Sequence, residues 1–124
     1  MAIRFIKVAV FYFVVGVGLG IHMGITDQFS FTSAHAHINL LGWVSLALAG
    51  LIYHAFPQAG KSRLAVVHYW LKMIGVPLLF IAMGLFGMGK VGPAVPLSAA
   101  GGVIVLTGTI LFTMNIMKNL QPNG

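Results

Sequence analysis

Four long apolar stretches dominate the pattern of hydrophobic and polar positions along the chain. They cover about residues 5–23, 34–56, 64–88 and 94–117, and only short polar segments separate them. Each stretch is long enough for a helix to cross the hydrocarbon core of a bilayer, which takes about 20 residues. The pattern therefore predicts an all-α, polytopic membrane protein whose four transmembrane helices form a single domain over residues 1–124.

The short segments between the stretches carry capping and turn signals. Thr32 and Ser33 end the first connection, and their hydroxyl groups can cap a helix that begins at Ala34 by accepting its free N–H groups. The second connection, residues 57–63, contains proline, glycine and two cations, a composition typical of a turn.

Composition and charge agree with a protein that lives in lipid. The chain is 59% hydrophobic and 6% charged, whereas soluble domains are about 25% charged. Seven lysines and arginines face a single acidic residue, and in so apolar a chain we interpret this excess as a topology signal rather than as evidence of a nucleic-acid partner. Five of the cations place both termini on the cytoplasmic side: Arg4, Lys7, Lys61, Arg63 and Lys118.

Two lysines need separate accounts. Lys72 lies about two turns into the third helix, and we expect its ammonium group to reach the cytoplasmic face along apolar surface. Lys90 falls in an outer connection, where the topology rule does not explain a cation. The chain has no cysteine, so thiolate chemistry and iron–sulfur clusters are excluded, and histidine and methionine remain as soft ligands.

Five histidines are the candidate functional residues, because an imidazole in hydrocarbon needs a partner such as a metal, a carbonyl group or a water molecule. His22, His35 and His37 fall near the outer face. His54 and His68 fall near the inner face, where we expect them to bond loop backbone or water. His35 and His37 are two residues apart, about 200° around a helix, so they face opposite sides and cannot chelate one ion. A water-filled cavity or a loop cap remains the alternative role for this pair.

The second apolar stretch resembles a helix of a known family. It opens with AHAH at residues 34–37 and closes with YHAFP at residues 53–57. This pattern looks like the tenth helix of haem-copper oxidase subunit I, the catalytic subunit of cytochrome c oxidases, cbb3-type oxidases and nitric oxide reductases, in which His-x-His opens the helix and His-x-Phe-Pro closes it. The third stretch continues the likeness with HYWL at residues 68–71 and IGV at residues 74–76, although Pro77 stands where many members have asparagine.

The likeness extends through the rest of the chain. The sequence GMGK at residues 87–90 falls where the family places an arginine pair after a Gly-Met-Pro turn, and Asn115 and Lys118 resemble the ending of cbb3-type subunits. The resemblance thus covers about residues 34–120.

The resemblance implies a haem site. In the family the first histidine of the pair ligates a high-spin haem and the second ligates a low-spin haem on the other side of the helix, which agrees with the opposite-facing geometry above. Carried over, His35 and His37 would each bind haem iron, Lys90 would neutralise haem propionates, and His22 is a further candidate ligand. The Cys-x-x-Cys-His motif for covalent attachment is missing, so haem b is expected.

The departures from the family limit this implication. The family's copper ligands and cross-linked tyrosine lie in helices that this chain does not have, and the chain has no glutamate for proton uptake. Neither a copper centre nor a complete oxygen-reducing site within one copy is therefore expected.

The family also suggests an assembly. Its subunit comprises three four-helix arcs around a pseudo-threefold axis, and this chain resembles one arc. We expect a homotrimer in which His37 of one protomer and His35 of its neighbour face each other across one haem, because closed cyclic assemblies of identical chains are common. Iron with two histidine ligands is closed to oxygen, so this arrangement favours electron transfer.

Three functions therefore compete. The first is a b-type haem protein of the bacterial cytoplasmic membrane, for electron transfer or gas sensing, with an unidentified redox partner. The second is a small cofactor-free transporter or structural subunit, which we disfavour because we expect only weak polar groups, such as Ser45, Thr107 and Thr109, in the middles of the helices. The third is an oligomeric haem enzyme that reduces oxygen or nitric oxide.

Overall fold

The computed structural model describes residues 1–120, and this part of the chain is helical without strands. The elements in chain order are α1 (Ala2–Thr26), α2 (Thr32–His37), η1 (Ile38–Val44), α3 (Ser45–Ala55), α4 (Pro57–Gly60), α5 (Arg63–Gly87) and α6 (Val91–Asn119). Four helical segments are long and apolar enough to cross a membrane: α1, the continuous run α2–η1–α3, α5 and α6. The predicted all-α fold with four transmembrane helices is confirmed.

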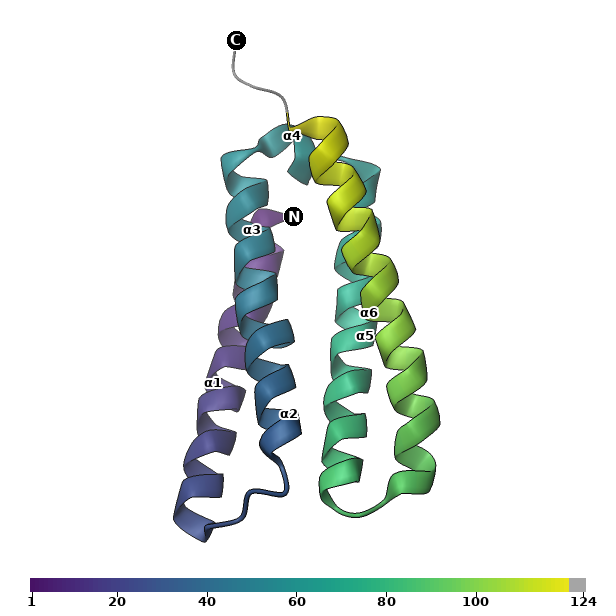
Figure 1. Cartoon of the computed structure of the whole chain (residues 1–124). Coiled ribbons are helices and arrows are strands. Elements are labelled where there is room, and N and C mark those ends of the chain that lie inside the picture. Colours follow the sequence, from purple (N-terminus) through teal and green to yellow (C-terminus); the bar gives the residue numbers. More distant parts are fainter. Residues whose placement is uncertain (121–124) are drawn as a thin grey trace.

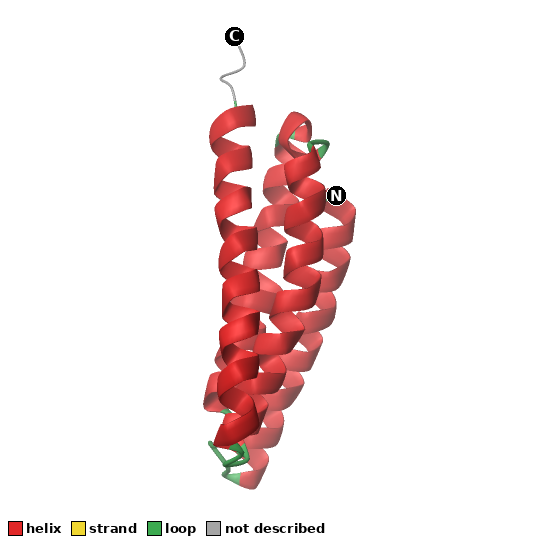
Figure 2. Ribbon diagram, turned by 90° about the vertical axis from the view of Figure 1, so that its right-hand side faces the viewer, coloured by secondary structure: helices red, strands yellow, loops and turns green. Residues whose placement is uncertain are grey.

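The four long segments form two antiparallel pairs. Figure 1 shows α1 beside the α2–η1–α3 run and α5 beside α6, and Figure 2 shows the four segments running along a common axis. The N-terminus, α4 and the last turn of α6 lie at one end, which we call the inner end after the predicted orientation, and the α1–α2 and α5–α6 connections lie at the outer end. The N-terminus and the end of α6 thus share one end, and the C-terminus itself falls outside the described residues; the cytoplasmic location of this end stays a prediction.

The helix boundaries differ from the apolar stretches by one to three residues. The largest extensions are at both ends of α1 and at the start of α6, because a helix can continue through residues of mixed polarity at which the apolar stretch has ended. The expected cap at the second helix is wrong. The helix begins at Thr32 with Phe31 as its N-cap residue, and the Thr32 hydroxyl donates to the Phe29 carbonyl group over 2.6 Å.

A side-chain cap occurs instead at α5, and the connection before it is partly helical. Pro57 begins the short helix α4, where its missing N–H group costs nothing. The Ser62 hydroxyl then accepts the backbone N–H of Ala65 over 3.2 Å and caps α5. The same hydroxyl donates to the Ala59 carbonyl group, so α4 and α5 are held together at the inner end.

A π-helical segment, η1, follows directly after the histidine pair. Within it Gly42 lies against Tyr12 of α1, and a Cβ atom on Gly42 would lie 2.8 Å from Tyr12 Cγ. Segments of π-helix are rare and frequently adjoin functional sites. The sequence periodicity did not predict this one.

Candidate functional site

His35 lies in α2 against α1. Its Nδ1 atom is 3.0 Å from the carbonyl oxygen of Gly16. Because a carbonyl group only accepts, this contact assigns the proton to Nδ1 and leaves the lone pair of Nε2 free. The Asn39 amide nitrogen lies 3.2 Å from the same Nδ1 atom, but with the proton on Nδ1 these two donors cannot bond to each other. The amide donates instead to the His35 carbonyl group over 2.9 Å.

Glycines of α1 provide the space for this imidazole. A Cβ atom on Gly20 would lie 2.8 Å from His35 Cε1, and one on Gly16 would collide with the Asn39 amide, whereas nothing lies within 4 Å of the Cβ position of Gly18. Gly16 and Gly20 thus allow α1 and α2 to approach closely, and Gly18 does not take part in this contact. The His35 ring could not keep its position beside a larger residue at position 20.

His37 has the same kind of backbone contact in different surroundings. Its Nδ1 atom is 2.8 Å from the Ser33 carbonyl oxygen, so the proton is again assigned to Nδ1 and Nε2 is free. The ring borders an apolar cavity of about 280 Å³ that Ala36, Leu40 and Leu41 also line. His35 contacts α1 and His37 borders this cavity, so the two imidazoles serve separate environments.

His22 and Lys90 lie near the outer end as well. His22 is exposed on α1, and its carbonyl group accepts the Thr26 hydroxyl over 2.7 Å. Lys90 is exposed in the α5–α6 turn, where its backbone N–H donates to the Leu85 carbonyl group over 2.9 Å. Within residues 1–120 no group of three or more His, Cys, Asp or Glu side chains could hold a metal ion. The predicted site residues therefore share one end of the bundle without forming a closed metal cluster in one chain.

Two residues expected at the inner face lie inside the bundle instead. His68 is 2% exposed, and its Nδ1 atom is 2.9 Å from the Tyr53 hydroxyl, so its expected bond to loop backbone or water is wrong. Lys72 is 4% exposed and donates to the Thr109 hydroxyl over 2.8 Å, so its expected extension to the cytoplasmic face is also wrong. Helix α6 covers this face of α5, and its Gly108 packs beside the lysine, because the Cβ position of Gly108 lies at ordinary contact distance, 3.7 Å, from Lys72 Cε.

A buried hydrogen-bond network joins the helices at the inner end. Asn115 is fully buried and donates to the Tyr53 hydroxyl over 3.3 Å and to the Ala59 carbonyl group over 3.0 Å. Its Oδ1 atom accepts from Asn119 over 2.7 Å and lies 2.9 Å from the Ser62 hydroxyl, whose single proton is shared between this atom and the Ala59 carbonyl group. The signal that could have identified this network is an asparagine within an otherwise apolar helix, because buried amides in lipid need partners.

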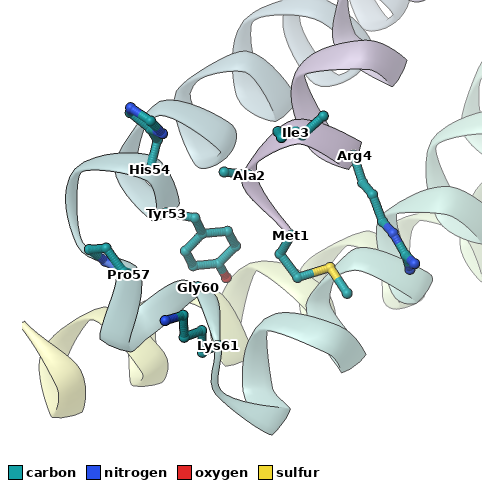
Figure 3. A pocket seen from close by; sticks show the side chains of 9 residues that line it. All are labelled: Met1, Ala2, Ile3, Arg4, Tyr53, His54, Pro57, Gly60 and Lys61. Atoms are coloured by element: carbon teal, nitrogen blue, oxygen red, sulfur yellow. The ribbon is translucent and has the colours of Figure 1, made fainter.

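The inner end also contains an open cavity of about 470 Å³ that includes His54. Figure 3 shows Tyr53 at the centre of the lining residues, between the chain start at Met1 and Gly60, with His54 pointing away from the tyrosine ring. His54 is exposed, as expected for an interfacial residue. Cations from two segments, Arg4 and Lys61, also line this cavity.

Comparison with known proteins supports a partial relationship to haem-copper oxidase subunit I. The chain is 31% identical over 65 residues to the cbb3-type cytochrome c oxidase subunit CcoN1 of Stutzerimonas stutzeri, a match that covers 48% of this chain and 14% of that protein. The chain thus matches one short part of a much longer relative. No family model and no solved structure matches the chain. The family resemblance of the sequence is confirmed to this extent, for a membrane protein similar to a fragment of an oxidase subunit.

Proposed function

We propose that this chain is a membrane-embedded b-type haem protein whose His35 and His37 ligate haem iron for electron transfer. The observation that carries the proposal is that both imidazoles are held at Nδ1 by backbone carbonyl groups, those of Gly16 and Ser33, with Nε2 free. A histidine that ligates a metal almost always donates its other ring N–H to a carboxylate, a carbonyl group or water, because this bond orients the ring and raises its basicity. Both members of the pair meet that requirement.

The surroundings of the pair fit haem b. The cavity beside His37 is apolar, as the face of a macrocycle requires, and Lys90 at the same end of the bundle offers a cation for propionates. The chain has no cysteine for thioether attachment, so the haem would be held by its iron ligands and by packing. When bound, haem supplies one-electron redox chemistry. His22 is a further candidate ligand from α1.

The assembly that we propose is a homotrimer in the bacterial cytoplasmic membrane. His35 and His37 lie in separate environments, so an iron with two histidine ligands needs a second chain or His22. The similarity to a short part of CcoN1 supports an oxidase-like arc that several copies complete. In this ring His37 of one protomer and His35 of its neighbour would hold one haem. The redox partner is unassigned.

The test is the visible absorption spectrum of the purified protein, oxidised and reduced, with histidine variants. We expect a b-type α-band in the reduced wild-type protein and a loss of haem in both His35→Ala and His37→Ala. His54→Ala, at the exposed inner end, is the matched control and should keep its haem.

Three outcomes would contradict the proposal in different ways. A colourless wild-type protein from haem-replete cells would refute the haem function altogether. Haem loss in only one of the two histidine variants would refute the shared site between protomers. Equal loss in His54→Ala would show that the effect is not specific to the pair.

A further inference from the structure

A third cavity lies within the bundle, between the α2–η1–α3 run and the α5–α6 pair. Its volume is about 340 Å³, and most of its wall consists of leucine, isoleucine, alanine and phenylalanine side chains. Four polar side chains also line it: Ser45, His68, Lys72 and Thr109. None of these residues belongs to the proposed haem site, and the haem proposal assigns them no role.

Lys72 is a buried cation without a counter-ion among residues 1–120, the part of the chain that the structure describes. An ammonium group has three donors, and Thr109 accepts one of them. The Thr109 hydroxyl itself donates to the Val105 carbonyl group over 2.9 Å, so it acts toward Lys72 as an acceptor only. The whole sequence has one acidic side chain, Asp27, and this residue follows α1 at the outer end, remote from the middle of α5.

The depth of Lys72 makes this lack of a counter-ion significant. Lys72 is the tenth residue of α5, about 14 Å along the helix from its inner end. An ionisable group at such a depth usually pairs with an opposite charge or lies on the path of a substrate or an ion. The structure thus leaves a positive charge that a ligand from outside the chain can neutralise.

His68 adds a second donor to the same wall. The Tyr53 hydroxyl accepts from Asn115 and lies 2.9 Å from His68 Nδ1, so it can donate its own proton to that atom. The proton of the neutral imidazole is then assigned to Nε2. The cavity is thus lined by three side chains with donor groups: Lys72, His68 and Ser45. Several donors beside one cavity suit a ligand group with two acceptor oxygen atoms.

We propose that this cavity binds a lipid-soluble monocarboxylate, of the class of long-chain fatty acids, with Lys72 as the counter-ion of its carboxylate. Charge complementarity argues for an anion, and the apolar wall argues for an alkyl chain rather than a hydrated inorganic ion. Leu48 lines the cavity and is 54% exposed, so the cavity borders the surface that faces lipid. A single-chain carboxylate can therefore enter from the bilayer.

The experiment measures the binding of oleate to the purified full-length protein in detergent by isothermal titration calorimetry. We expect saturable binding to the wild-type protein and an affinity at least tenfold lower for Lys72→Met, which keeps the apolar stem and removes the charge. Lys118→Met, which removes an exposed cation at the inner end of α6, should bind like the wild-type protein. Methyl oleate, which has the same chain without the charge, should not bind.

A second variant keeps the test valid if Lys72→Met fails to fold. Leu48→Trp fills the lipid-facing edge of the cavity at an exposed position and retains Lys72, and it should also lower oleate affinity at least tenfold. The proposal is overturned if methyl oleate binds as well as oleate, if Lys118→Met loses as much affinity as Lys72→Met, or if acetate displaces oleate at similar concentration, which would indicate a free-anion site. Oleate binding by His35→Ala should be unchanged, so this test is separate from that of haem.

Discussion

Replacing Gly20 with alanine tests the contact that holds His35 against α1. The added Cβ atom would lie 2.8 Å from His35 Cε1, which is 0.6 Å less than the 3.4 Å at which ordinary van der Waals contact begins. Because the backbone of α1 cannot yield as easily as a side chain, the imidazole must move by several tenths of an ångström. That movement also strains the 3.0 Å contact between Nδ1 and the Gly16 carbonyl oxygen.

The size of this displacement sets the expected effect on haem. Ligand positions must be kept within about 0.5 Å of the productive geometry, and disturbing the partner of a ligating histidine costs 10–100-fold in metal affinity. We therefore expect Gly20→Ala to bind haem about 10–100-fold more weakly, a loss of about 1.4–2.7 kcal/mol. The gain in helix propensity from glycine to alanine, at most about 1 kcal/mol, does not cancel this loss.

Gly18→Ala is the matched control, because it makes the same chemical change on the same helix where nothing lies within 4 Å of the new Cβ atom. Haem content is measured from the reduced absorption spectrum of the purified protein, and thermal unfolding is followed by circular dichroism. Gly18→Ala should retain haem and unfold at or above the wild-type temperature, and Gly20→Ala should be lower in both. Equal haem content and equal unfolding temperatures in the two variants would refute the proposed role of Gly20.

Three further predictions address the buried network, the outer cation and the assembly. Asn115→Leu removes three hydrogen bonds, to Tyr53, Ala59 and Asn119, from a fully buried site, so it should lower the free energy of unfolding in mixed micelles by about 2 kcal/mol at about 0.6 kcal/mol per bond. Asn119→Leu removes one of these bonds, and an equal loss in both variants would contradict the assigned network. Lys90→Ala should lower the haem reduction potential, because an unneutralised propionate favours ferric iron, whereas Lys118→Ala should leave the potential unchanged. An unchanged potential of Lys90→Ala in a spectroelectrochemical titration would show that Lys90 does not neutralise a propionate. Mass measurement in detergent should give a trimer that loses haem on dissociation, and a monomer that keeps six-coordinate haem would assign His22 as the second ligand.

The sequence alone determined the membrane fold and the position of the histidine pair. Hydropathy is a local property, so four apolar stretches predict four spanning helices wherever those helices pack. The spacing of His35 and His37 is also local, because side chains two positions apart on one helix face opposite sides whatever surrounds them. The resemblance to haem-copper oxidase subunit I also rested on motifs that are continuous in the sequence, and the similarity to CcoN1 agrees with it.

Only the tertiary structure decided what lies opposite each side chain. Lys72 and His68 were expected at the inner face, but α6 and Tyr53 cover them, because hydropathy does not tell which face of a helix meets a neighbour. The proton of His35 is assigned by the carbonyl group of Gly16, 19 residues earlier in the chain. Close approach at Gly20 and its absence at Gly18 likewise depend on the rotation of α1 against α2. In a membrane both the lipid-facing and the protein-facing surfaces of a helix favour hydrophobic residues. Packing and hydrogen bonds therefore determine which face meets a neighbour, and these contacts exist only after the helices have met.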